Sequence, residues 1–175
     1  MLELVLGGAR SGKSALAVAK AQRSGRDVLF VATARAADEE MRERIARHRR
    51  DRPAAWTTYE APLHLAPILA TATPSCFVIV DCLTLWLANV LYPAHEGAFA
   101  LDAAAWDRER RALLDALRGL RCDAVLVSNE VGLGLVPETP VGRRFRDEQG
   151  RLNQHVAALC DRVTLVAAGL PLTLK

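Results

Sequence analysis

The chain has 175 residues, a mass of 19.0 kDa, 51 % hydrophobic residues and 25 % charged residues. This composition is typical of a globular protein with a buried core, and the length predicts a single domain over residues 1–175. The net charge of +3 is too small to indicate nucleic-acid binding by itself. No apolar run approaches the ~20 residues that a membrane-spanning helix needs.

The cysteines lie far apart and form no CxxC pair, at Cys76, Cys82, Cys122 and Cys160. They stand in or beside apolar runs, which predicts buried thiols in a reducing compartment rather than metal ligands. An apolar strand pattern begins directly after Met1 and leaves no room for a signal peptide. We therefore expect a cytoplasmic protein.

Short, continuous apolar runs alternate with helical patterns along the chain. The runs predict strands at Leu2–Leu6, Val28–Ala32, Phe77–Asp81, Ala124–Ser128 and Val163–Ala167. The stretches between them predict helices at Lys13–Arg23, Asp38–Arg50, Leu83–Leu91, Ala103–Leu120 and Gly142–Cys160. This alternation predicts an α/β fold, a RecA-like and mostly parallel sheet flanked by helices. Residues 170–175 predict a last edge strand, and residues 92–99 predict a surface loop.

The first predicted strand leads directly into a phosphate-binding loop of the P-loop NTPases. The loop reads Gly7-Gly8-Ala9-Arg10-Ser11-Gly12-Lys13-Ser14, with a helix pattern behind it. Glycines allow backbone N–H groups to surround phosphate oxygens, and the new helix adds its positive N-terminal end. In such loops the lysine, here Lys13, reaches the β- and γ-phosphates, and the Ser14 hydroxyl binds Mg²⁺. The sequence therefore predicts nucleoside triphosphate binding.

Phosphoryl transfer also needs a second metal anchor, which is usually an aspartate at the end of a hydrophobic strand. Asp81 follows Phe77-Val78-Ile79-Val80 and fits this role. The alternative is that Asp81 caps the helix predicted at Leu83–Leu91. A second polar group, Asn129-Glu130, follows the fourth predicted strand, and there a ligand-facing role for Glu130 and a plain glycine-rich loop are equally compatible with the sequence.

Residues 42–52 carry many arginines opposed by few acids: Arg42, Arg44, Arg47, Arg49, Arg50 and Arg52. Such a run is usually a solvated helix face, but the excess cation also suits an anionic partner such as a triphosphate. Cations around an imidazole disfavour its protonated form, which would leave His48 neutral and able to act as a nucleophile.

Several stretches together resemble the bifunctional adenosylcobinamide kinase / adenosylcobinamide-phosphate guanylyltransferases of cobalamin biosynthesis. The resemblance runs through essentially the whole chain and is densest in its last third. It rests on residues 7–14, Glu40-Met41, Arg44-Ile45, His48, Arg52-Pro53, Trp56 through Glu60, Asp81-Cys82-Leu83-Thr84, Asn89, Ser128-Asn129-Glu130-Val131-Gly132, Val136-Pro137, Phe145-Arg146-Asp147, Gly150-Arg151, Asn153-Gln154 and Ala168-Gly169-Leu170-Pro171.

The resemblance implies two reactions on one scaffold. Adenosylcobinamide is phosphorylated with ATP or GTP, and GMP from GTP is then transferred onto that phosphate through a guanylyl-histidine. It places the nucleophile at His48, with Lys13 as a second catalytic group and Mg²⁺ held by Ser14 and Asp81. It also implies a homotrimer. Nucleotide contacts are implied at Gly7, Gly8, Ala9, Arg10, Ser11, Gly12, Lys13, Ser14, Thr33, Ala34, Arg35, Arg49, Arg50, Asp51, Arg52, Glu60 and Asp81.

Other functions remain open at this stage. A small-molecule kinase without transferase activity, a nucleotide sensor and a RecA-like ATPase or nucleic-acid-binding module all share the phosphate loop. The last would use the arginine run to contact a nucleic-acid backbone, but few aromatic residues accompany that run, so base stacking and a nucleic-acid partner are not expected. The sequence leaves the corrinoid-binding residues open, with 92–99 and 132–147 as the candidate segments.

Overall fold

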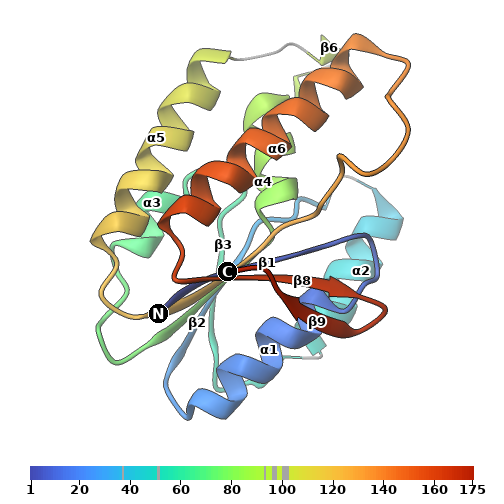
Figure 1. The fold of residues 1–175 in the computed structure, drawn as a ribbon. Helices are drawn as coiled ribbons and strands as arrows, with labels where there is room; N and C mark the ends of the chain where they lie inside the picture. Colours follow the sequence, from blue (N-terminus) through green and yellow to red (C-terminus); the bar gives the residue numbers. More distant parts are fainter. Residues whose placement is uncertain (37, 51, 93, 96–97, 100–102) are drawn as a thin grey trace.

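The structure, a computed structural model, describes residues 1–36, 38–50, 52–92, 94–95, 98–99 and 103–175. A seven-stranded sheet forms its centre, with the strand order β3-β2-β4-β7-β1-β8-β9 (Figure 1). All neighbouring strands are parallel except β8 and β9, which are antiparallel. The strands are β1 (Leu2–Gly7), β2 (Val28–Ala32), β3 (Thr57–Glu60), β4 (Phe77–Asp81), β7 (Asp123–Val127), β8 (Arg162–Ala167) and β9 (Leu170–Thr173).

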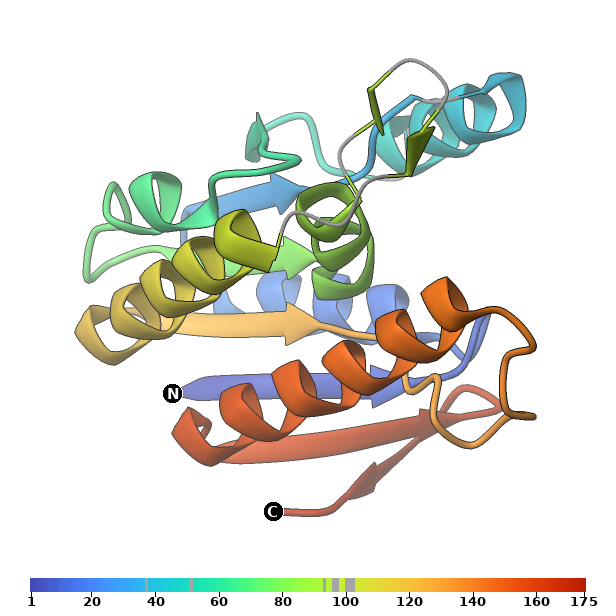
Figure 2. The same cartoon turned by 90° about the horizontal axis from the view of Figure 1, so that it is seen from above.

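Helices cover both faces of the sheet. One face carries α1, and the other carries α3, α4, α5 and α6 (Figures 1 and 2). Helix α2 lies beyond the ends of the strands, at the edge towards which β2 and β4 point (Figure 2). The helices are α1 (Lys13–Ser24), α2 (Glu39–Arg50), α3 (Leu65–Leu69), α4 (Leu83–Leu91), α5 (Ala103–Gly119) and α6 (Pro140–Leu159).

Alternate residues of the strands feed two separate hydrophobic clusters. Leu4 packs with Trp86 and Trp106 on the face covered by α3 to α6, whereas Val5 packs with Ala17 on the α1 face. Burial on both faces explains why the strands read as continuous apolar runs. None of the helices in the described part of the chain combines the length and the apolar character needed to cross a bilayer.

The predicted α/β class, a mostly parallel sheet flanked by helices with a C-terminal edge strand, is confirmed. Each predicted strand in the run from β1 to β8 agrees with the structure to within one residue at either end, and each predicted helix to within two. Strand β3 and helix α3 were not predicted, and neither were two short strands within the segment from residue 92 to residue 99. Within the segment predicted as a surface loop, β5 (Ala94–His95) pairs with β6 (Ala98–Phe99), while residues 93, 96 and 97 lie outside the described residues.

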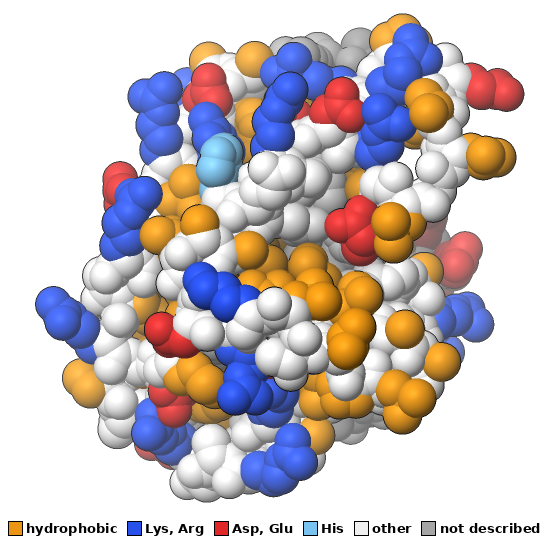
Figure 3. Space-filling view, viewed as in Figure 1, with side chains coloured by type: hydrophobic (Ala, Val, Ile, Leu, Met, Phe, Trp, Pro, Cys, Tyr) orange, Lys and Arg blue, Asp and Glu red, His pale blue; other side chains and the backbone are white. Residues whose placement is uncertain are grey.

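The final strand leaves apolar side chains uncovered. Leu170, Leu172 and Leu174 are exposed, and hydrophobic side chains gather over β8 and β9 in Figure 3. Since β9 is an edge strand, its outer backbone groups have no neighbouring strand in the sheet order.

Candidate active site

The phosphate loop connects β1 to α1 at the carboxyl end of the sheet. Gly12 precedes the helix with φ 102°, a left-handed conformation that glycine adopts without steric cost. A Cβ on Gly7 would lie 2.4 Å from the carbonyl oxygen of Val166, so only glycine fits this position. Lys13 is buried, and its Nζ donates a hydrogen bond to the carbonyl oxygen of Gly8. Close backbone contacts and the hydrogen bond from Lys13 thus determine the shape of the loop.

The turn between β8 and β9 braces this loop. The backbone N–H of Gly169 donates a 2.9 Å hydrogen bond to the carbonyl oxygen of Ser11. A Cβ on Gly12 would approach the Cα of Gly169 to 3.3 Å, which is tight contact. The loop therefore rests on a hairpin that lies about 160 residues further along the chain.

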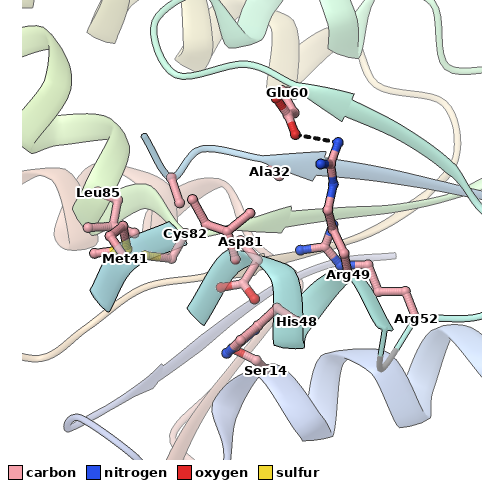
Figure 4. Close-up of a pocket in the computed structure, with 12 residues that line it drawn as sticks. Ser14, Ala32, Met41, His48, Arg49, Arg52, Glu60, Asp81, Cys82 and Leu85 are labelled. Atoms are coloured by element: carbon pink, nitrogen blue, oxygen red, sulfur yellow. Dashed lines mark ion pairs between the residues drawn. The ribbon is translucent and has the colours of Figure 1, made fainter. Parts of the chain in front are cut away.

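Three adjoining cavities open over the loop, and Ser14, His48 and Asp81 line all of them. The largest, about 400 Å³, is floored by residues 9–15 and walled by Val127 and Asn129. A second reaches from Ser14 to Met41, Arg49 and Glu60 on the α2 side. Figure 4 shows the imidazole of His48, from α2, beside Ser14 at the start of α1, with the Asp81 carboxylate next to them. The predicted nucleophile and the two predicted metal ligands thus meet at one place.

Asp81 ends β4 and points into these cavities. The N-cap position of α4 is occupied by Cys82, the residue after it, and no side chain caps that helix. The structure thus favours the ligand-facing position of Asp81 over the helix-capping alternative. Cys82 also lines two of the cavities, but burial, reinforced by the Asp81 carboxylate, raises the pKa of its thiol to about 11. It therefore stays protonated and is a poor nucleophile at neutral pH.

The α2 side of the site is held by charged and aromatic contacts. Arg49 forms a 2.7 Å ion pair with Glu60, from β3, shown as a dashed line in Figure 4. The guanidinium of Arg52 lies 3.6 Å from the ring centroid of Phe30, which in turn stacks on Trp56. Burial lowers the pKa of Arg52, against the opposing effect of the Asp81 carboxylate, and Arg49 lowers this pKa further. Its buried Nη1 finds no hydrogen-bond partner among the described residues.

The remaining predicted nucleotide contacts fall into several groups. Ala34 lines the cavity on the α2 side, and Ala9 and Arg10 line the large one. Thr33 is buried, and its hydroxyl both donates to the carbonyl oxygen of Cys82 (2.7 Å) and accepts from the N–H of Cys82 (2.8 Å). Four members of the predicted set do not line the three cavities: Gly7, Gly8, Arg35 and Arg50. Asp51 lies outside the described residues.

Comparison with known proteins decides between the functions left open by the sequence. The family described as "Cobinamide kinase / cobinamide phosphate guanyltransferase" matches residues 3–174. The chain belongs to this family. Family membership confirms the resemblance and supports a kinase and guanylyltransferase, and it does not support the nucleic-acid-binding alternative.

Relatives in this cobinamide kinase family match over their full length. The chain is 50 % identical to the bifunctional adenosylcobalamin biosynthesis protein CobP of Pseudomonas aeruginosa, covering 100 % of this chain and 98 % of the relative. It is 38 % identical to the corresponding CobU protein of Salmonella typhimurium, with 100 % of both chains covered. Among solved structures, a RadB recombinase aligns with a TM-score of 0.47 and 17 % identity, over 94 % of this chain and 73 % of the recombinase.

The structure distinguishes the two members of the polar pair that follows β7. Glu130 could face a ligand or belong to a plain glycine-rich loop. Its carboxylate accepts a 2.6 Å hydrogen bond from the N–H of Gly132, so it stabilises its own loop. Asn129, next to it, lines the large cavity, and a buried polar network from α6 holds its backbone. Polar Gln149 and Asn153 on the core-facing stripe of α6 were the signal in the sequence that could have revealed this network.

Proposed function

We propose that this protein phosphorylates adenosylcobinamide with ATP or GTP and then transfers GMP from GTP onto the new phosphate through a guanylated His48. The observation that carries the proposal is that His48, Ser14 and Asp81 line the same cavities above a phosphate loop. A kinase alone would need only the loop and the carboxylate. The imidazole at the same place supplies the nucleophile for the second reaction.

Guanylyl transfer then proceeds in two displacements. An imidazole nitrogen of His48 attacks the α-phosphorus of GTP, a P–N bond forms, and pyrophosphate leaves. The phosphate of adenosylcobinamide phosphate next attacks the same phosphorus, which breaks the P–N bond and restores His48. The loop amides and Lys13 would stabilise charge on the leaving pyrophosphate. This division of one difficult displacement into two predicts ping-pong kinetics.

Ser14 and Asp81 have the chemistry to hold Mg²⁺. A hydroxyl and a carboxylate oxygen facing one cavity are hard donors of the kind this ion prefers. No cluster of three histidine, cysteine or acidic residues that could cage a metal is found in the described part of the chain. That donor set suits an ion bound by few protein oxygens and completed by phosphates and water. When bound, Mg²⁺ neutralises charge on the phosphates.

Arg52 is the cation on the α2 side that is best placed for the nucleotide. Arg49 is already paired with Glu60, whereas the Nη1 of Arg52 is buried beside the cavity and has no partner among the described residues. A phosphate or guanine oxygen would give that buried donor the hydrogen bond it lacks. Arg49 and Glu60 line the same pocket as an ion pair, and we propose that a bound nucleotide contacts both residues.

The corrinoid must reach the phosphate cavity from its open side. Leu133, Leu135 and Val136 follow Asn129 along the chain and are strongly exposed. We propose that this apolar part of segment 132–147 contacts the corrin macrocycle, which also presents a large apolar face.

We further propose a homotrimer in the cytoplasm, as the family resemblance implies. The exposed leucines on edge strand β9 offer a surface for contact between subunits (Figure 3). The cysteines are unpaired, which suits a reducing compartment.

The proposed function is tested by the intact mass of the protein after addition of GTP. We expect a gain equal to one GMP that is lost on mild acid treatment. His48→Ala should abolish the gain, and His155→Ala, which removes an exposed histidine of α6, should retain it. An adduct that persists in His48→Ala would overturn the assignment of the nucleophile. Transfer of label from γ-labelled ATP or GTP to adenosylcobinamide measures the kinase reaction separately.

A further inference from the structure

Asn129 stands between the two halves of the phosphate site. It follows β7, which lies in the sheet between β4, ending at Asp81, and β1, which leads into the phosphate loop. It lines the large cavity together with Lys13 and Asp81. Asn129 therefore lies at the cavity over the loop that is proposed to bind the phosphates.

The backbone of Asn129 is fixed on both sides. Its N–H donates a 2.8 Å hydrogen bond to Oγ1 of Thr84, from α4. Its carbonyl oxygen accepts a 3.1 Å hydrogen bond from Nδ2 of Asn153, from α6. With both backbone groups occupied, the side-chain amide is left to face the cavity, and it forms no hydrogen bond to another described residue.

A buried polar network holds Asn153 in turn. Oγ of Ser128 donates to Oδ1 of Asn153 at 2.7 Å. Nε2 of Gln149 donates to the same Oδ1 at 3.0 Å and to Oγ of Ser128 at 2.9 Å. Ser128 and Gln149 are fully buried, and Asn153 is 5 % exposed. Buried polar groups are costly unless they are hydrogen-bonded, and these bonds favour one arrangement of the three side chains, although Oε1 of Gln149 has no hydrogen-bond partner among the described residues. This network fixes where Asn129 stands.

The linings of the two cavities indicate which phosphate of a bound nucleotide would lie near Asn129. Arg49 and Glu60 line the cavity on the α2 side, and Asn129 does not line that cavity. Asn129 lines the cavity over the loop, where Arg49 and Glu60 are absent from the lining. If His48 attacks the α-phosphorus, the β- and γ-phosphates extend over the loop. The amide of Asn129 then lies at the terminal-phosphate end.

We propose that Asn129 is a catalytic residue of the kinase reaction, and that Asn153 and Thr84 are its positioning residues. This rests on the proposed function and assigns a role within that same site. The substrate hydroxyl oxygen attacks the γ-phosphorus, and the bond from that phosphorus to the oxygen that bridges the β- and γ-phosphorus atoms breaks. The nucleoside diphosphate leaves, and the hydroxyl proton passes to water. Nδ2 of Asn129 donates a hydrogen bond to a γ-phosphoryl oxygen as charge shifts in the transition state.

Asn129→Ala tests the catalytic role directly. The backbone N–H and carbonyl remain, so the bonds to Thr84 and Asn153 are retained and the fold should be preserved. Loss of one preorganised donor typically lowers kcat by about 10²-fold or more, and we expect kcat for phosphorylation of adenosylcobinamide to fall by ~100-fold with little change in the nucleotide KM. The rate of adduct formation on His48 should change by less than ~3-fold, since its reacting phosphorus is the α-phosphorus.

Asn153→Ala tests the positioning role. It removes the donor to the Asn129 carbonyl, so we expect kcat for phosphorylation to fall while the nucleotide KM stays near its wild-type value. Gln154→Ala is the matched control, because it removes an exposed amide from the neighbouring position of α6. Gln154→Ala should retain the wild-type kcat and KM.

Two outcomes would overturn the assignment. One is an Asn129→Ala variant that phosphorylates adenosylcobinamide at the wild-type rate. The other is an equal fall in phosphorylation and in adduct formation, which would mean that Asn129 supports nucleotide binding in general. A wild-type protein that phosphorylates adenosylcobinamide but forms no adduct would refute the His48 chemistry alone. The role of Asn129 would still be decided by the phosphorylation rate.

Discussion

The phosphate loop with α1 and the arginine-rich helix α2 meet at one site but are built in opposite ways. Helix α1 buries Lys13, Ala17 and Ala21, and its loop fits tightly between β1, β8 and the β8–β9 turn. Among the described side chains of α2, none is fully buried. Helix α2 lines the site with Met41, Ile45, His48 and Arg49, and it is joined to the sheet by the ion pair of Arg49 with Glu60 and, just after its end, by Arg52 over the Phe30 ring.

This contrast separates the proposed phosphate-binding element from the element that carries the proposed nucleophile. Helix α1, which follows the loop proposed to bind phosphates, packs into the hydrophobic core through Ala17 and Ala21. Helix α2, which carries the proposed nucleophile His48, has little apolar burial of its own, and segments of that kind open more readily than the core. Bound nucleotide would contact both, so we infer that the ligand itself completes the attachment of α2.

Hydrogen exchange should give the largest difference between the two regions. We expect amides in the interior of α2 to exchange at least ~100-fold faster than those of α1, because local opening of α2 disrupts little buried surface. A non-hydrolysable GTP analogue should slow exchange in α2 far more than in α1. Equal protection of both helices without nucleotide would contradict the contrast.

Gly7→Ala should disrupt the packing of the phosphate loop against β8. The new methyl group would lie 2.4 Å from the Val166 carbonyl oxygen, so the loop or β8 must shift. Overpacking of this kind costs ~1–3 kcal/mol, and we expect that loss in the free energy of unfolding, together with loss of nucleotide binding. Urea denaturation and GTP titration measure the two effects.

Gly150→Ala is the control for that substitution. Its Cβ would meet nothing within 4 Å on α6. Alanine is favoured over glycine in a helix interior by ~1 kcal/mol, so this variant should be as stable as the wild type or more stable. Two variants of equal stability would show that the close approach at Gly7 has no cost.

Arg52→Lys should give the smallest effect and sharpen the description of the α2 side. A lysine keeps the charge but loses the planar guanidinium over the Phe30 ring. Cation–π contacts contribute ~0.5–2 kcal/mol, and we expect stability to fall by ~1 kcal/mol in urea denaturation. Arg47→Lys, at an exposed position of α2, should leave stability unchanged. An equal effect of both substitutions would argue against the Phe30 contact.

The parts of the fold that were predicted are those whose own residues determine them. Strands buried on both faces are largely apolar runs, and β2 and β4 stand out for that reason, while β1 includes the buried Glu3 among its apolar residues. Strand β3 was missed because Thr57–Glu60 is short, polar and exposed, and only its pairing with β2 makes it a strand. The start of α6 was predicted two residues late, although Thr139 as N-cap and Pro140 as first residue are an ordinary start signal.

The site divides in the same way. The phosphate loop and Asp81 are local patterns with fixed spacing, so the sequence predicts them directly. The ion pair of Arg49 with Glu60 and the stacking of Arg52 on Phe30 join separate elements, and no local pattern indicates them. The hydroxyl of Thr33 bonds to the backbone of Cys82, a residue 49 positions away, which depends on β2 and β4 being neighbours.

The hydrogen bond from Gly169 to Ser11 joins a residue that is synthesised late to one that is synthesised early. A nascent polypeptide carries residues 7–14 out of the ribosome long before β8 and β9 emerge. Until that hairpin docks, the glycine-rich segment has its motif but lacks the scaffold that shapes it. We therefore expect the loop to adopt its described shape only after β8 and β9 have been made, when all earlier strands of the sheet are already available.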